Sequence, residues 1–434
     1  MTPGARVAAA IEVLADVEGR RRPVQDALKD WGLSHRFAGS GDRAAIADRV
    51  YDALRRRRST AWALDDDSPR AAVLGSVAPE EVRSWAGDRH APEVGEAELP
   101  SPDDRAARLA GAPVHVRGDY PEWLAPAFGR AFGEEAPAEG AALAERPPTR
   151  LRANTLGTPR DALIPKLAGH PVLSRAGDGA VSAGRWSPDA VRLAPGVDVR
   201  RFAPTATAEF LHGGYEIQDE GSQLAARLSG AAPGEQVGDL CAGAGGKTLA
   251  LAALMANRGQ VFAHDVDARR LAKADERLRR AGVRNAQLLF PRPGALDGLA
   301  GRLDLAFVDA PCTGSGTWRR NPDAKWRLRP GALEQRRREQ AEALALAAPL
   351  VRPGGRLVYV TCSVLLEEND DVIAAFLAAN PGWGIRPAEA VVRAAVPSVA
   401  DALLAAVQAR AHGLQMTPRL TGVDGFYVAV LEKE

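Results

Sequence analysis

The sequence predicts an α/β fold with a mostly parallel sheet for the second half of the chain. From about residue 215 onward, short apolar runs alternate with stretches of helical periodicity. That alternation is typical of parallel strands joined by helices that cover both faces of a sheet. A glycine-rich loop follows one run at 241–248, and acidic residues or cysteines end others. Because the carboxyl ends of parallel strands share one edge of the sheet, we expect a functional site there.

The composition is that of a soluble globular protein with room for two or three domains. The chain has 434 residues, of which 46% are hydrophobic and 26% are charged, as is usual for such proteins. No apolar run is long enough to span a membrane, and residues 1–18 lack a signal-peptide core. Three cysteines without paired spacing predict a reducing, cytoplasmic location, and they argue against disulfides and a zinc or other metal site.

The charge balance leaves nucleic-acid binding open. The formal net charge is only +1, so no global positive field points to nucleic acid. Arginine runs occur at 20–22, 55–58 and 336–338. Such runs are usually solvated helix faces, although clustered arginines are also the electrostatic signature of an RNA-binding surface.

The first part of the chain, to about residue 135, is expected to be helical. Apolar residues recur there at helical spacing, most clearly as Val7, Ile11 and Leu14 and as Ile46, Val50 and Leu54. Three tryptophans are expected to anchor the helical core: Trp62, Trp85 and Trp123. Residues 132–148 are rich in Gly, Ala, Glu and Pro and are interpreted as a linker. A small domain of short strands and one helix is expected at 150–212.

The α/β segment then runs from 213 to 434. Strands are expected at 236–240, 260–264, 303–308 and 356–361, with a closing β segment at 426–431. Helices are expected at 223–228, 248–255, 269–280, 332–350 and 368–378.

The loop between the first strand and its helix is a candidate cofactor site, because such a turn offers backbone N–H groups and a helix N-terminus to an anionic group. Its residues are Cys241, Ala242, Gly243, Ala244, Gly245, Gly246, Lys247 and Thr248. A P-loop NTPase would need glycine in place of Cys241, and a dinucleotide site needs Gly-x-Gly-x-x-Gly, a spacing that is absent here. The third candidate ligand is S-adenosylmethionine. Asp265 follows Gly243 by 22 residues, where an acid could bind ribose hydroxyls by analogy with dinucleotide folds; a helix N-cap is a compatible role.

Two cysteines and an aspartate are expected at the ends of two strands. Asp309-Ala310-Pro311-Cys312 follows the strand at 303–308, and Cys362 follows the strand at 356–361. A free cysteine is commonly a small buried filler, and that interpretation is open for each cysteine alone. Together with Asp309, the pair suggests thiol chemistry on a bound substrate.

These motifs together resemble the Sun/Fmu family of S-adenosylmethionine-dependent RNA cytosine-C5 methyltransferases, which includes bacterial 16S rRNA enzymes. The resemblance covers residues 150–434 well. It rests on motifs in the family's order, at 218–223, 239–248, 309–317, 320–323, 359–363 and 424–427. Residues 1–135 resemble, through weaker motifs, the NusB-like RNA-binding domain of the bacterial enzymes.

The resemblance implies a Rossmann-like class I methyltransferase domain at 213–434, preceded by a small α+β RNA-binding domain at 150–212 and the helical domain at 1–135. It implies S-adenosyl-L-methionine as cofactor and RNA, with 16S rRNA as the expected target. The implied cofactor-binding residues are Cys241, Ala242, Gly243, Ala244, Gly245, Gly246, Lys247, Asp265 and Asp309. No membrane or protein partner is implied, and we expect a monomer.

The resemblance also implies roles for the catalytic residues. In the family, the cysteine matching Cys362 adds to C6 of cytosine and turns the ring into an enamine whose C5 accepts a methyl group. The cysteine matching Cys312 assists breakdown of the adduct, and Asp309 would bind near N3 of the base. Lys247 would steady either the methionine carboxylate or the base. The base must first be unstacked from its neighbours. Four side chains that follow the Asp309 loop could hold phosphates or stack on a neighbouring base: Arg319, Arg320, Lys325 and Trp326.

The chain departs from the family pattern in two places. The family's Pro-Gly-Gly-Lys-Thr turn begins here with Ala244, which frees one φ angle. The family's acid near adenine is missing from 287–292, where Pro291 stands at about its position. A catalytically inactive RNA-binding ribosome-assembly factor of the same fold is therefore the alternative, and the intact Cys312, Cys362 and Asp309 favour the enzyme.

Overall fold

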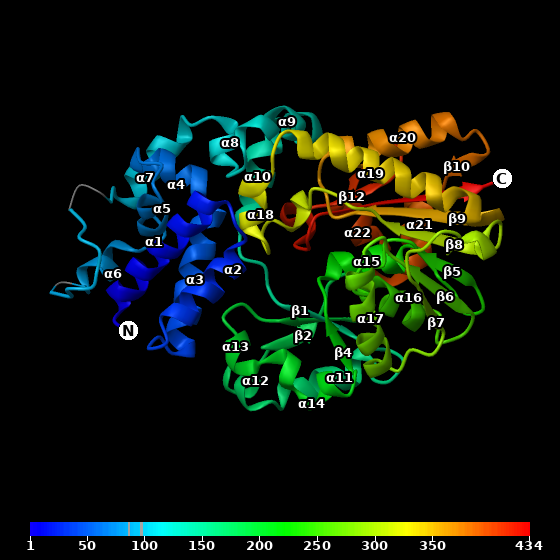
Figure 1. The fold of residues 1–434 in the computed structure, drawn as a ribbon, viewed down its shortest axis with the longest axis horizontal. Helices are drawn as coiled ribbons and strands as arrows, with labels where there is room; N and C mark the ends of the chain where they lie inside the picture. Colours follow the sequence, from blue (N-terminus) through cyan, green and yellow to red (C-terminus); the bar gives the residue numbers. More distant parts are fainter. Residues whose placement is uncertain (86, 96–98) are drawn as a thin grey trace. The chain divides into compact units, whose positions relative to one another are not determined.

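The structure is a computed structural model that describes residues 1–85, 87–95 and 99–434. It divides into two compact units (Figure 1). The first, called the helical unit here, comprises residues 1–146 together with 317–330. The second, the sheet unit, comprises residues 147–316 and 331–434. The chain therefore passes from the sheet unit into the helical unit after Gly316 and returns at Gly331.

The helical unit consists of short helices around an apolar core. They are α1 (Pro3–Arg20), α2 (Val24–Ser34), α3 (Ser40–Arg55), α4 (Arg57–Leu64), α5 (Pro69–Leu74), α6 (Pro79–Arg83), α7 (Pro102–Ala110), α8 (Val114–Arg117), η2 (Glu122–Leu124), α9 (Ala125–Phe132), η3 (Gly133–Glu135), α10 (Ala136–Ala144) and α18 (Pro322–Arg327). Helix α1 begins after Thr2, whose hydroxyl accepts the Ala5 N–H, a favoured helix start. Its buried face carries Val7 and Leu14, as the periodicity predicted.

Two sequence-based expectations for this unit are wrong. Residues 132–148 are not a linker, because η3 and α10 occupy most of that stretch and Leu143 is buried in the fold. Of the three tryptophans expected in the core, Trp85 is buried, but Trp62 is 45% exposed and Trp123 is half-buried. Alanine and glutamate are good helix formers, so a composition that suggested a linker also suits a helix.

Residues 317–330 pack within the helical unit, although the sequence placed them in the catalytic segment. The Arg55 guanidinium donates to the Arg319 carbonyl at 3.2 Å, and the Lys325 ammonium donates to the Arg55 carbonyl at 3.1 Å. Arg319 and Lys325 are only 4% and 1% exposed. Neither side chain is therefore available to hold RNA phosphates at the surface, as the sequence had suggested.

A small antiparallel sheet opens the sheet unit. Its strands are β1 (Arg150–Ala153), β2 (Val181–Ala183), β3 (Ala190–Leu193) and β4 (Tyr215–Ile217), in the order β2-β3-β1-β4. Around it lie α11 (Arg160–Ala168), α12 (Pro171–Arg175), α13 (Val199–Phe202), η4 (Pro204–Ala206) and α14 (Ala208–Leu211). Strand β4 pairs with β1, so residues 215–217 belong to this sheet, although the expected catalytic segment began at 213.

In the part of the chain that the structure describes, the large sheet has nine strands, with a parallel central part as predicted. They are β5 (Gln236–Asp239), β6 (Gln260–His264), β7 (Ala286–Leu289), β8 (Leu303–Asp309), β9 (Val351–Thr361), β10 (Trp383–Ile385), β11 (Gln408–Ala409), β12 (Leu414–Met416) and β13 (Phe426–Lys433). The order is β11-β12-β13-β9-β8-β5-β6-β7, with β10 beside β13. Strands β5 to β9 pair in parallel, and β13 runs antiparallel to β9.

Helices cover both faces of this sheet. They are α15 (Glu220–Arg227), α16 (Gly246–Leu254), α17 (Ala268–Arg280), α19 (Gly331–Ala347), α20 (Asp370–Ala379), α21 (Ala388–Ala395), α22 (Ala400–Ala406) and α23 (Pro418–Thr421), with the short turns η5 (Asp297–Leu299), η6 (Ser315–Thr317), η7 (Ala348–Leu350), η8 (Leu366–Glu368) and η9 (Pro397–Val399). Along β9, Val358 and Val360 face the core under α15, α16 and α21, while Leu357 and Tyr359 face the core under α19 and α20. None of the helices in the described residues is long and apolar enough to cross a membrane.

The strand order reverses at β5, whose neighbours are β6 on one side and β8 on the other. In open α/β sheets, ligands bind outside the carboxyl ends of the strands at such a switch point. The loop after β5 and the residues after β8 therefore lie where this rule places a site, within the sheet unit.

Candidate active site

The loop after β5 is held at the sheet edge by Asp265, which follows β6. One carboxylate oxygen of Asp265 accepts the Gly243 N–H at 2.7 Å, and the other accepts the Asp267 N–H at 2.8 Å. Asp265 is only 4% exposed. Each carboxylate oxygen has a second lone pair, so Asp265 can fix the loop and still accept hydrogen bonds from a ligand's hydroxyl groups.

A second acid lies beneath the same loop. Asp239, the last residue of β5, accepts a hydrogen bond from the Thr248 hydroxyl at 2.6 Å, which joins the strand to α16. Burial raises the pKa of Asp239 to about 7. Its other oxygen, Oδ1, is buried and has no hydrogen-bond partner among the described residues. Burial likewise raises the pKa of the neighbouring Cys241 thiol well above its usual value, so Cys241 remains neutral.

An arginine that the sequence did not reveal supports the start of α16. The Arg152 guanidinium, from β1 of the small sheet, donates to the Gly246 carbonyl at 3.0 Å and to the Gln218 side chain at 2.5 Å. Burial lowers the pKa of Arg152 to about 10. A charged residue within a four-residue strand was the one signal in the sequence for a special role of Arg152. Its partner, the Gly246 carbonyl, lies 94 residues away in sequence.

Lys247 and Asp309 form an ion pair at the switch point. The Lys247 ammonium lies 2.5 Å from the Asp309 carboxylate and 5.2 Å from the centre of the Phe426 ring. Burial alone would lower the pKa of Lys247, but the Asp309 carboxylate outweighs it and the net shift is upward. Lys247 therefore carries a positive charge beside the residues that follow β8.

The two predicted cysteines meet at the ends of adjacent strands. Strands β8 and β9 pair in parallel with Asp309 opposite Val360, which brings the next residues of both strands to one edge. The sulfurs of Cys312 and Cys362 lie 3.3 Å apart. The hydrogen bond with Cys362, together with burial, raises the pKa of the Cys312 thiol well above its usual value. Both sulfurs can thus face one substrate, with Cys312 as a neutral thiol.

A buried glutamate, also missed by the sequence, braces both cysteine loops. The Glu368 carboxylate accepts the Thr313 N–H at 2.7 Å and also binds the Thr313 hydroxyl, the Ser363 hydroxyl and the Gln340 amide. Glu368 is fully buried. Burial raises its pKa, although its hydrogen bonds oppose the shift. Thr313 follows Cys312 and Ser363 follows Cys362, so one side chain sets the spacing of the two loops.

Close backbone contact fixes the far end of the Cys312 loop. The Gly316 N–H donates to the Cys362 carbonyl at 2.9 Å, and the Gly425 N–H donates to the Gly316 carbonyl at 2.8 Å. A Cβ atom on Gly316 would come within 2.2 Å of the Gly425 carbonyl oxygen. Larger residues are therefore excluded at Gly316, which accounts for the glycine in this motif.

The edge beyond β6 carries apolar side chains where the family pattern has an acid. His264 and Leu289 are paired residues of β6 and β7, so the residues just after them are neighbours at the sheet edge. Val266 is 83% exposed and Phe290 is 45% exposed. The chain after β7 therefore offers exposed apolar surface near Asp265 and no carboxylate at 287–292.

The structure thus gathers Lys247, Asp309, Cys312 and Cys362 at one sheet edge, with the loop of residues 241–246 and Asp265 beside them. Arg319 and Lys325 are buried in the helical unit and do not join this group. Among the described residues, no cluster of His, Cys, Asp and Glu has the arrangement of a metal site. Nucleophilic chemistry on a bound substrate is what this set of residues can perform.

Comparison with known proteins identifies two matching family models. One, for 16S rRNA methyltransferase RsmB/F, matches residues 228–432, and the other, an RsmF/B-like ferredoxin-like domain, matches residues 120–200. The ribosomal RNA small subunit methyltransferase B of Sodalis glossinidius is 35% identical over 326 residues, which are 74% of this chain and 67% of that protein. The chain therefore spans about two thirds of the length of that relative.

Solved structures agree with the fold. The crystal structure of PH0851 matches 100% of this chain and 99% of its own, with a TM-score of 0.71 at 24% identity. A methyltransferase homolog protein from Pyrococcus horikoshii covers 74% of this chain and 98% of its own, with a TM-score of 0.57 at 27% identity. The predicted Rossmann-like methyltransferase fold is confirmed. The chain belongs to the RsmB/F family of 16S rRNA methyltransferases and is an RNA methyltransferase that uses S-adenosylmethionine.

Proposed function

We propose that this enzyme methylates C5 of a cytosine in ribosomal RNA, with 16S rRNA as the target, through a covalent bond between Cys362 and C6 of the base. The observation that carries the proposal is the pair of sulfurs 3.3 Å apart, beside the Lys247–Asp309 ion pair. C5 of cytosine is a poor nucleophile, and covalent addition at C6 is a direct way to activate it. Two thiols within reach of one base supply an attacking group and a second group for adduct breakdown.

The reaction can be written with its electrons balanced. The Cys362 thiolate adds to C6, and the C5–C6 double-bond electrons become available at C5. When bound, S-adenosylmethionine would supply the methyl group: its methyl–sulfur bond breaks, and that electron pair stays on sulfur in the neutral thioether S-adenosylhomocysteine. The electron pair at C5 forms the new carbon–carbon bond, the C5 proton then leaves to a base, and the C6–sulfur bond breaks to restore the double bond and the thiolate. Asp309 would hold the proton at N3 that draws electrons into the ring, and Cys312 would assist the elimination.

The residues present suit the cofactor. The buried, unpartnered Asp239 Oδ1 would be satisfied by a cationic amino group, since a buried acceptor without a partner is costly. Asp265 keeps free lone pairs for ribose hydroxyls, and the Lys247 ammonium would lie beside either the methionine carboxylate or the base. Phe290 and Val266 would hold adenine by apolar contact in place of the missing acid.

We further propose that residues 1–135 and the small domain at 150–212 contribute RNA affinity rather than chemistry, and that the enzyme acts as a monomer. The NusB-like character of residues 1–135 stays a prediction. Arg152, in strand β1 of the small sheet, donates a hydrogen bond to the Gly246 carbonyl. The small domain therefore also supports the loop that is proposed to bind the cofactor.

Bisulfite sequencing of unmethylated 16S rRNA, incubated with the enzyme and S-adenosylmethionine, tests this function. Wild-type protein should protect one cytosine from conversion, and Cys362→Ser should protect none. Nucleoside analysis of the same RNA should give 5-methylcytidine. A methylated nucleoside other than 5-methylcytidine would overturn the assignment to C5.

A further inference from the structure

A cavity within the helical unit has the chemistry of a nucleotide site. Its volume is about 580 Å³, within the roughly 300–1,000 Å³ range of small-ligand sites. Its walls include two indoles, Trp123 and Trp326, and a set of arginines. The mechanism uses none of these residues.

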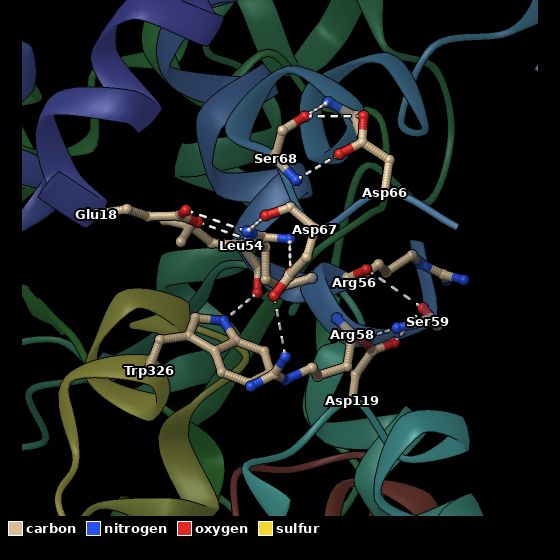
Figure 2. A network of polar contacts seen from close by, with 12 residues as sticks. Glu18, Leu54, Arg56, Arg58, Ser59, Asp66, Asp67, Ser68, Asp119 and Trp326 are labelled. Atoms are coloured by element: carbon tan, nitrogen blue, oxygen red, sulfur yellow. Dashed lines mark hydrogen bonds and ion pairs between the residues drawn. The ribbon is translucent and has the colours of Figure 1, made fainter. Parts of the chain in front are cut away.

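The Trp326 wall is rigid. Its indole N–H donates to the Leu54 carbonyl at 2.6 Å, so the ring cannot turn without breaking that bond. The Lys325 ammonium lies 4.6 Å from the ring centre and the Arg58 guanidinium 5.9 Å from it. Figure 2 shows the Arg58 side chain beside the ring. Because both cations lie over the indole, a base would contact the half-buried edge of the ring together with the Arg58 guanidinium, and bases stack on guanidinium planes as well as on aromatic rings.

Positive charge exceeds negative charge around the cavity. Arg58 forms an ion pair with Asp67 at 3.4 Å, and Arg327 forms one with Asp323 at 3.2 Å. Arg21 and Arg329 line the same cavity, are exposed, and form no ion pair among the residues that the structure describes. These two guanidinium groups can therefore bind an anion without first breaking an internal pair.

We propose that this cavity binds one unstacked nucleotide of the RNA substrate, with the base against the indoles and the flanking phosphates at Arg21 and Arg329. Aromatic surface and free guanidinium groups together are how proteins hold single-stranded RNA. The proposal rests on RNA being the substrate of the proposed function. An acidic protein segment would also satisfy the arginines, but it leaves the indoles unexplained.

In this proposal, the cavity makes the phosphate contacts that the sequence analysis had expected of Arg319 and Lys325. Those residues are buried, but Trp326 lies in the same segment, 14 residues after Cys312 in the chain. The sequence therefore indicated the right segment, which supplies Trp326 and Arg329, while Arg21 and Trp123 come from other elements.

Fluorescence anisotropy with the full-length protein tests the proposal. The probe is a labelled single-stranded oligoribonucleotide of about eight nucleotides. Arg21→Gln with Arg329→Gln should weaken binding and reduce the slope of log K against log salt by about 1.4, because each lost phosphate contact on single strands removes about 0.7. The matched control is Arg36→Gln with Arg117→Gln, which removes two exposed arginines outside the cavity and should leave the slope closer to wild type.

The indole contact is tested separately. Trp123→Ala should weaken binding at least about fivefold, since stacking contributes about 1–3 kcal/mol per base, and Trp123→Phe should restore most of it. Phe37→Ala, at a 75% exposed aromatic residue outside the cavity, is the control and should bind like wild type. A 4-thiouridine-containing probe should crosslink to peptides that carry Trp123 or Trp326.

Wild-type affinity and salt slope in the cavity variants, or crosslinks that map only elsewhere, would overturn the cavity site. Capture of an acidic peptide but not the oligoribonucleotide at the cavity would also overturn it. These readouts do not depend on methyl transfer. If the enzyme failed to make 5-methylcytidine but the cavity variants still lost RNA affinity, the proposed reaction would fail while the nucleotide site stood.

Discussion

Replacing the two cysteines one at a time tests the covalent mechanism, because the sulfurs are 3.3 Å apart yet are proposed to act in different steps. Cys362→Ser replaces the proposed attacking sulfur by a hydroxyl that is scarcely ionised at neutral pH, so addition to C6 should stop. Cys312→Ala leaves the proposed attacking group in place and removes the thiol that is proposed to assist elimination.

The size of the Cys312 effect follows from its surroundings. The hydrogen bond with Cys362, and then burial, raises the pKa of Cys312 well above its usual value, so it enters the reaction as a neutral thiol suited to proton transfer. A positioned group of this kind contributes about 10²–10⁴-fold. Elimination should slow by about that factor in Cys312→Ala. Loss of one sulfur from the core should cost only about 1 kcal/mol of stability, so the variant should still fold.

Denaturing electrophoresis with labelled rRNA measures the outcome. Cys312→Ala should accumulate a protein–RNA band that depends on S-adenosylmethionine, and mass spectrometry should place the link on the peptide with Cys362. Cys362→Ser should give neither the band nor methylated RNA. Thermal melting of both variants checks that they remain folded.

Two results would refute this reasoning. If Cys362→Ser trapped the adduct and Cys312→Ala formed none, the attacking group would be Cys312. If both variants methylated RNA at the wild-type rate, the cysteines would be core filler and the covalent mechanism would fall.

Four further predictions concern the residues around the site. Asp265→Ala should weaken S-adenosylmethionine binding by about 1–3 kcal/mol in calorimetry, because it removes the proposed ribose contacts as well as the hydrogen bond to the Gly243 N–H. Unchanged affinity would contradict the proposed role. Glu368→Gln should lower the rate constant for methyl transfer more than it lowers cofactor affinity, and it should cost about 1–3 kcal/mol of stability. The reason is that a neutral amide cannot accept all four hydrogen bonds. Equal losses in rate constant and cofactor affinity would count against this role of Glu368. Phe290→Ala should weaken S-adenosylmethionine binding by about 1 kcal/mol or more, whereas Phe290→Tyr should keep most of the affinity. The raised pKa of Asp239, about 7 in the folded state, means that the folded protein binds more protons than the unfolded chain between about pH 4 and 7, so stability should fall as pH rises through that window; Asp239→Asn should flatten that part of the melting-temperature profile, and an unchanged profile would exclude this source.

The sequence predicted the parts of the site that depend on local pattern. Cys312 and Cys362 each end an apolar run that reads as a strand, and adjacent parallel strands bring their carboxyl ends together. The meeting of the two sulfurs therefore followed from strand ends alone. The loop at 241–248 and Asp265 could be placed at the same sheet edge for the same reason, while their role in cofactor binding stays a prediction.

The parts that were missed depend on contacts between distant segments. Glu368 lies in η8, which turns the chain back so that its carboxylate reaches Thr313, 55 residues earlier. Arg152 reaches the start of α16 from a different sheet. Hydrophobic periodicity predicts which side of a segment is buried, but it does not identify the distant segment that packs against that side. The roles of Glu368 and Arg152 therefore could not be predicted from the sequence.

The segment at 317–330 shows the consequence most clearly. It leaves the sheet unit four residues after Cys312, and its contacts are with residues of the helical unit: the Trp326 indole binds the Leu54 carbonyl and Lys325 binds the Arg55 carbonyl. Deleting residues 1–146 would remove these partners and the apolar core against which Trp326 packs, so residues 317–330 would lose the contacts that hold their conformation. A truncated 150–434 protein would therefore change RNA affinity and the stability of the chain after the Cys312 loop at once. Point variants at the cavity separate the two effects, because they leave the Leu54 and Arg55 contacts intact.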